Sequence, residues 1–106
     1  MKVNVSSRST VIDKSLVKGI RDRVYSAMSR YSPRIEVVTV RIEDVDAARG
    51  GGETLCRLSV RIKELGSFAV ESVDDEMSVA VSRAAGRAAS RVLRLLDRQR
   101  EQGNSP

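Results

Sequence analysis

Apolar residues recur every three or four positions in two stretches of the chain, and each stretch predicts a helix. The first begins after Asp13, a suitable N-cap, and ends before Pro33, because proline disfavours helix in the residue before it. Its apolar stripe comprises Leu16, Val17, Ile20, Val24, Ala27, Met28 and Tyr31. The second opens with Asp74 and Asp75, whose charges suit the positive end of a helix dipole. Its stripe comprises Met77, Val81, Ala84, Ala88, Val92 and Leu95.

Four other segments have the β-branched content or the two-residue alternation of strands. In residues 54–63 the alternation is clearest, because apolar and polar side chains change places at every step. The other three strands are expected at residues 2–6, 34–45 and 68–73, with a loop at 46–53 and a turn at 64–67. The order β-α-β-β-β-α predicts an α+β fold in which a four-stranded sheet carries both helices on one face.

The length of 106 residues indicates one domain, which we expect to span residues 1–100, with a frayed tail at 101–106. No apolar run approaches the ~20 residues of a membrane span, and the N-terminus lacks the apolar core of a signal peptide. The single cysteine rules out an internal disulfide and suits a reducing compartment. A cytoplasmic protein without a membrane partner is therefore expected.

The residues of common active sites are scarce. The chain has no histidine, and its carboxylates lack the spacing of metal ligands. Cys56 falls among the apolar positions of its strand, which favours a buried thiol over a nucleophile. The glycine-rich segment 49–53 lacks the Lys-Ser/Thr of a P-loop and precedes a strand. We expect no enzymatic activity, no cofactor and no small-molecule substrate.

Positive charge is concentrated in the second helix. The chain has a net charge of +5, and residues 83–100 alone carry six arginines and one aspartate. Five of these arginines fall within an arc of roughly 80° beside the apolar stripe. This arginine row consists of Arg83, Arg87, Arg91, Arg94 and Arg98. Like charges four residues apart repel each other, so the row favours an anionic partner, with a solvated helix face as the alternative.

A weaker row lies on the first helix, where Lys14, Lys18 and Arg21 share an arc of about 60° with Tyr25. The sequence leaves open whether this first-helix row joins the arginine row or flanks the molecule on another side. It also leaves two interpretations of Gly86, which allows either close helix packing or the close approach of a partner.

The few aromatic residues bear on the kind of partner. Phe68 and Tyr31 lie in apolar patterns and are expected in the core, so they are poor candidates for stacking on bases. Recognition of folded RNA through its backbone and shape is the favoured hypothesis.

Two segments, "YSPRIEVVTVRIE" and "FAVESVDDEMSVAVSRAAGR", resemble motifs of the bacterial ribosome hibernation promoting factor and ribosome-associated inhibitor family. Members of this family are also described as sigma factor modulation proteins. The resemblance extends over residues 2–98 and is to the short forms, which lack a C-terminal dimerisation domain. Arg87 and Arg94 match basic positions of the family, whereas Ser90 and Ser78 stand where the family has a basic and an aromatic residue.

The resemblance implies a fold similar to double-stranded RNA-binding domains. It also implies a stress or stationary-phase factor that binds the small ribosomal subunit in the channel of messenger and transfer RNA and blocks translation. In this hypothesis the arginine row and the first-helix row contact phosphates of ribosomal RNA. Two alternatives remain: a protein-interaction module for an acidic protein such as a regulator or sigma factor, and a general double-stranded RNA-binding domain.

Overall fold

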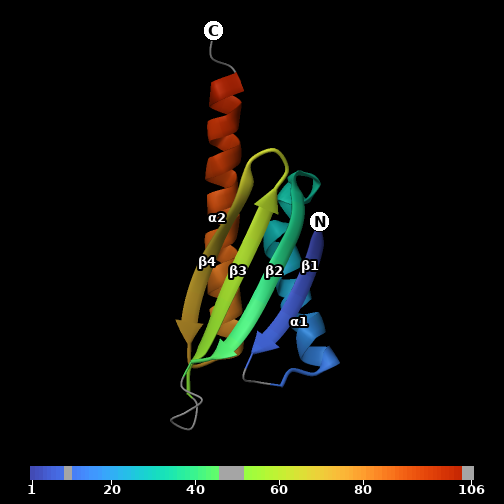
Figure 1. The fold of residues 1–106 in the computed structure, drawn as a ribbon, viewed down its shortest axis with the longest axis vertical. Coiled ribbons are helices and arrows are strands. Elements are labelled where there is room, and N and C mark those ends of the chain that lie inside the picture. The colour runs from blue at the N-terminus through green and yellow to red at the C-terminus, as the bar shows by residue number, and fades with distance from the viewer. Residues whose placement is uncertain (9–10, 46–51, 104–106) are drawn as a thin grey trace.

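The computed structural model describes residues 1–8, 11–45 and 52–103. Its elements follow the predicted order β-α-β-β-β-α, with one additional 3-10 helix, η1, after the first α-helix. They are β1 (Lys2–Arg8), α1 (Lys14–Met28), η1 (Ser29–Arg34), β2 (Ile35–Asp44), β3 (Thr54–Ile62), β4 (Gly66–Asp74) and α2 (Met77–Gly103). The strands form a four-stranded sheet in the order β1-β2-β3-β4. Both helices lie behind this sheet in Figure 1, so the predicted α+β architecture is confirmed.

The sheet is mixed, because β1 runs parallel to β2 whereas β2, β3 and β4 form an antiparallel meander. The parallel pair follows from the helix α1, which returns the chain across the sheet before β2 begins. This order places β1 and β4 at the two edges of the sheet. The outward edges of both strands are therefore open to contacts other than strand pairing.

The core lies between the sheet and the helices. Alternate residues of the central strands face the helices, such as Val40 on β2 and Leu58 on β3, which are paired in register and fully buried. The helices close the core with residues of the predicted stripes, including Val24 and Met28 of α1 and Val92 of α2. No helix of the described residues covers the opposite face of the sheet (Figure 1), which is called the open face below.

The first helix is shorter than its apolar pattern predicts. Its N-cap is confirmed, because the Asp13 carboxylate accepts a hydrogen bond of 2.8 Å from the backbone N–H of Leu16. The α-helix ends at Met28, and the chain continues as η1, which contains Pro33. Proline removes a backbone donor, so the tighter 3-10 turns take over before it. Tyr31 therefore lies in η1 and not on the stripe of the α-helix.

The second helix begins later than predicted. Asp74 is the last residue of β4, where it pairs with Thr54 of β3, and the α-helix starts only at Met77. The Asp74 carboxylate still stabilises the connection between β4 and α2, because it accepts a hydrogen bond of 2.9 Å from the N–H of Glu76. The helix then continues to Gly103 and projects past the end of the sheet in Figure 1. Residues 104–106 of the expected tail and residues 46–51 of the expected loop lie outside the described residues.

Candidate nucleic-acid interface

The arginine row runs along β4, the edge strand beneath α2. All five side chains are exposed, whereas Val81, Ala84, Ala88 and Val92 of the predicted stripe are buried against the sheet. The helix thus presents its apolar stripe to the core and holds the arginines beside it, as the helical spacing predicts.

Two arginines of the row bind the backbone of β4. Arg83 donates a hydrogen bond of 3.2 Å from Nη1 to the carbonyl oxygen of Val73, and its Nη2 lies 3.6 Å from a carboxylate oxygen of Asp74. Arg87 donates from Nη1 to the carbonyl oxygen of Glu71 at 2.6 Å. A guanidinium group has several N–H donors in a planar fork, so these contacts fix its position and leave further donors for an anion.

A third arginine is held by an aromatic ring. The guanidinium carbon of Arg91 lies 4.8 Å from the centre of the Phe68 ring, within the range of a cation–π interaction. Phe68 is half-buried at the margin of the core, as is Tyr31, so each belongs to the core only in part. On β4, Phe68 acts as a support for the arginine row.

A groove lies between β4 and this face of α2. It has a volume of about 470 Å³, with the arginines as its walls and with small residues of α2 and Val70 of β4 along its length. Gly86 is one of these small residues. A Cβ atom built at this position would meet no atom of the described residues within 4 Å, apart from its chain neighbours and the backbone of its own helix. Close helix packing therefore does not explain Gly86. The absent side chain widens the groove instead. The arginine row continues beyond it in a hollow that Arg94 and Arg98 line with Leu95.

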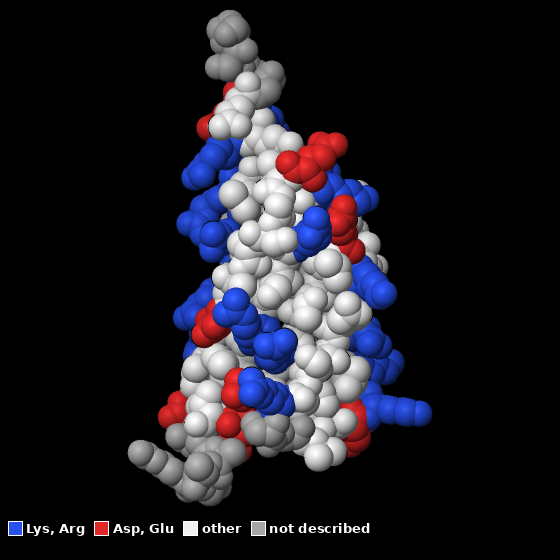
Figure 2. Space-filling model, viewed as in Figure 1, with Lys and Arg blue, Asp and Glu red and all other residues white. Residues whose placement is uncertain are grey.

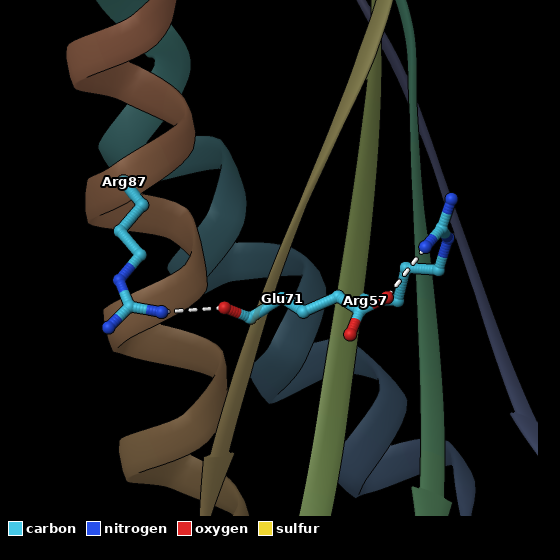
Figure 3. A network of polar contacts seen from close by, with 3 residues as sticks. All are labelled: Arg57, Glu71 and Arg87. Atoms are coloured by element: carbon cyan, nitrogen blue, oxygen red, sulfur yellow. Dashed lines mark hydrogen bonds and ion pairs between the residues drawn. The ribbon is translucent and has the colours of Figure 1, made fainter.

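Glu71 connects the arginine row to the open face of the sheet. Its backbone carbonyl binds Arg87, and its carboxylate lies 2.6 Å from Nη1 of Arg57, which is on β3 (Figure 3). Arg57 in turn lies opposite Arg41 of β2 in the register of the sheet. Figure 2 shows a group of Lys and Arg side chains on this face, with Asp and Glu side chains beside them, over the lower half of the sheet.

The first-helix row lies at the opposite edge. Arg21 donates from Nε to the carbonyl oxygen of Val3 on β1 at 3.4 Å, as the arginines of α2 do on β4. Lys18 pairs with Asp22 at 2.7 Å on the exposed surface, and Lys14 is also exposed. The two rows therefore flank the molecule and do not merge. Figure 2 shows Lys and Arg side chains along both long sides of the open face.

Cys56 is buried, as its place in the strand pattern predicts, and burial raises the pKa of its thiol to about 11. Among the described residues there is no group of three His, Cys, Asp or Glu side chains that could hold a metal ion. No helix in the described part of the chain is both long and apolar enough to cross a membrane.

The similarity of this chain to known proteins is found by comparison of structures and not of sequences. No family model matches the sequence, and no curated protein matches it significantly. The N-terminal domain of Protein Y from Thermus thermophilus superimposes with a TM-score of 0.68 at 21% identity, covering 89% of this chain and 98% of that domain. A ribosomal subunit interface protein from Coxiella burnetii superimposes with a TM-score of 0.70 at 10% identity, covering 89% of this chain and 96% of that protein.

This chain has the fold of these two proteins. They align over nearly their whole length, so the fold that the sequence resemblance implies is confirmed. The sequence did not reveal the β4 partners of the arginine row, which are backbone carbonyls and one aromatic ring. The signal in the sequence that could have indicated these partners is the four-residue spacing of the arginines. Four residues of a helix rise about 6 Å, which is close to the length of two residues in an adjacent strand.

Proposed function

We propose that this protein is a ribosome-associated translation inhibitor of the hibernation type. In this proposal it binds ribosomal RNA of the small subunit through the arginine row and the first-helix row. The observation that carries the proposal is the shared fold with a protein named for the interface of ribosomal subunits, at 96% coverage of that protein. The sequence motifs at the β2 and α2 boundaries support the same family independently of the structure comparison.

The placement of the two rows supports a channel as the binding site. Because the rows lie at opposite edges of the sheet, an isolated duplex would contact one row at a time. The Cα trace of the molecule extends 24 Å by 18 Å across its two shorter axes, and this slender shape suits insertion into a cleft. A cleft with RNA on both walls would contact both rows together. A protein bound in the messenger RNA channel of the ribosome would exclude messenger RNA from that channel.

The contacts of the arginine row favour binding to phosphates. Arg83, Arg87 and Arg91 are held on β4 before any ligand arrives, so less side-chain freedom is lost when they bind an anion. Each phosphate neutralised by a basic side chain contributes about one unit to the slope of log K against log salt concentration. Removing two phosphate-binding arginines should therefore lower that slope by about two units.

The test is co-sedimentation of the purified protein with small ribosomal subunits over a range of salt concentrations. Wild-type protein should bind saturably, and the pair Arg87→Glu/Arg94→Glu should lose binding while keeping its circular dichroism spectrum. The control is Arg30→Glu/Lys63→Glu, which makes the same change in net charge at exposed positions outside both rows. The pair Lys14→Glu/Lys18→Glu tests the first-helix row separately.

Equal loss of binding in the control pair would show that net charge alone matters and would contradict a role for the rows. Binding of the wild-type protein that does not change with salt would contradict phosphate contacts altogether. Competition by duplex RNA at concentrations equal to those of the ribosomal subunits would favour a general double-stranded RNA-binding domain. Weak competition by the duplex supports the ribosome as the target.

A further inference from the structure

The outer edge of β4 has backbone groups that pair with no other strand of the described residues. In an antiparallel pair, a residue directs both its N–H and its C=O either toward the neighbouring strand or away from it. The carbonyls of Glu71 and Val73 bind arginines of α2, so these residues direct their backbone groups away from β3. The register between β3 and β4 is continuous from Thr54–Asp74 to Ile62–Gly66. Ala69, two residues before Glu71, therefore also directs its N–H and C=O outward.

The strand β4 itself lacks several of the features that prevent strand addition. β4 is nine residues long, contains no proline and pairs with β3 without a bulge. A long, regular edge of this kind is a template for pairing with another extended chain. The features that guard it are the arginine side chains of α2, which lie over its carbonyls.

Because the arginines over the β4 edge are positively charged, they select which kind of strand can approach it. Two copies of β4 that approached each other would bring Arg83 and Arg87 of one copy close to the same residues of the other. An extended segment with acidic side chains would be attracted instead, since its carboxylates can take the guanidinium groups from the weaker backbone acceptors. The released carbonyls of Glu71 and Val73 would then pair with the backbone of the incoming strand.

The groove beside β4 suits such a segment. Alternate side chains of an added strand would point toward α2, because side chains alternate between the two faces of a sheet. On that side they would meet the groove of about 470 Å³, which has arginine walls and lacks a side chain at Gly86. Acidic side chains at every second position would thus lie among cations.

We propose that the β4 edge is a docking surface for an extended acidic segment of a partner protein, which adds to the sheet as a fifth strand. This surface includes part of the arginine row but does not depend on binding to the ribosome. A partner of this kind would compete with RNA for Arg83, Arg87 and Arg91. Its recognition would combine backbone hydrogen bonds to β4 with charge pairing to α2.

The first experiment uses a short synthetic peptide of alternating glutamate and threonine, with a glutamine and threonine peptide as the uncharged control. Hydrogen exchange of the wild-type protein is followed by NMR with and without each peptide. The acidic peptide should slow exchange at the outward N–H groups of Ala69, Glu71 and Val73. The inward-facing residues Val70 and Ser72, which pair with β3, should change little.

The second experiment separates strand pairing from charge attraction. Ala69→Pro removes one outward N–H and leaves the β3 pairing and every arginine in place, since proline is accepted on the open side of an edge strand. This substitution should weaken binding of the acidic peptide by about tenfold, which is the equivalent of one hydrogen bond. Arg83→Gln/Arg87→Gln should abolish the preference for the acidic peptide over the uncharged one.

Peptide binding without slowed exchange on β4 would overturn the proposal, as would equal affinity of wild-type protein and a folded Ala69→Pro. Exchange in the wild-type protein remains decisive if Ala69→Pro does not fold. Failure here is distinguishable from failure of the proposed function, because Ala69→Pro keeps both basic rows and should still co-sediment with ribosomal subunits. If RNA alone engages this edge, RNA slows exchange on β4 and the acidic peptide does not, and the proposal is wrong.

Discussion

The replacement of Gly86 by alanine tests the architecture of the groove on α2. Glycine in the interior of a helix costs about 1 kcal/mol relative to alanine, because it has more conformational freedom in the unfolded chain. Gly86 lies well inside α2, and a Cβ atom at this position would contact nothing within 4 Å. The new methyl group therefore causes no clash. Nearly all of the difference in helix propensity between glycine and alanine should be observed as an increase in the free energy of unfolding.

A matched control exists on the other helix. Gly19 of α1 is also exposed, also helical, and also free of neighbours within 4 Å of an added Cβ atom. Gly86→Ala and Gly19→Ala should each raise the free energy of unfolding by about 1 kcal/mol, and the double variant by about 2 kcal/mol. For a domain of this size each substitution should raise Tm by about 4–8 °C.

Urea denaturation followed by circular dichroism measures these changes, and the m-value should stay constant because neither substitution alters the buried surface. The two variants should differ in binding, since only Gly86 borders the groove between the arginines. Ribosome or peptide binding should weaken in Gly86→Ala and remain unchanged in Gly19→Ala. A loss of stability in Gly86→Ala alone would mean that a neighbouring side chain occupies the space beside Gly86, and this would contradict the presence of a groove there.

Three further predictions concern individual side chains. Burial raises the pKa of the Cys56 thiol from 9.0 to about 11, so the folded state keeps its proton to higher pH than the unfolded state does. The free energy of unfolding should be unaffected by this group below pH 9 and should fall between pH 9 and 11. The decline should be shallower in Cys56→Ala. An equal decline in both proteins would contradict this prediction. The Ser72 hydroxyl is buried and has no hydrogen-bond partner in the described residues, so Ser72→Ala should raise stability by about 1 kcal/mol in urea denaturation. A loss would indicate a bound water. Asp13→Ala should lower stability by about 1 kcal/mol through the lost N-cap, whereas Asp13→Asn should retain most of it, and equal values would show that the cap contributes nothing.

The fold could be predicted from the sequence because each element carries a local pattern. The two-residue alternation around Leu58 fixes both the strand and its buried face. The face of α2 is fixed by apolar residues that recur every three or four positions, namely Val81, Ala84, Ala88 and Val92. The helix boundaries were less accurate. Asp74 favours a helix N-terminus when taken alone, but its pairing with Thr54 across the sheet keeps it in β4. That contact joins residues far apart in the chain, which a local pattern does not contain.

The candidate site shows the same division. The spacing of the arginines on one face of α2 could be derived from the sequence, and their exposure agrees with it. The position of that face over an edge strand depends on sheet order, because the same helix laid across the centre of the sheet would have no free carbonyls beneath it. Arg83 and Arg87 therefore do more than present charge: they cover acceptors on β4 that another strand could otherwise use. In the proposal above, an acidic strand that draws these two arginines away would uncover the carbonyls of β4, so its charge pairing and its strand pairing would be coupled.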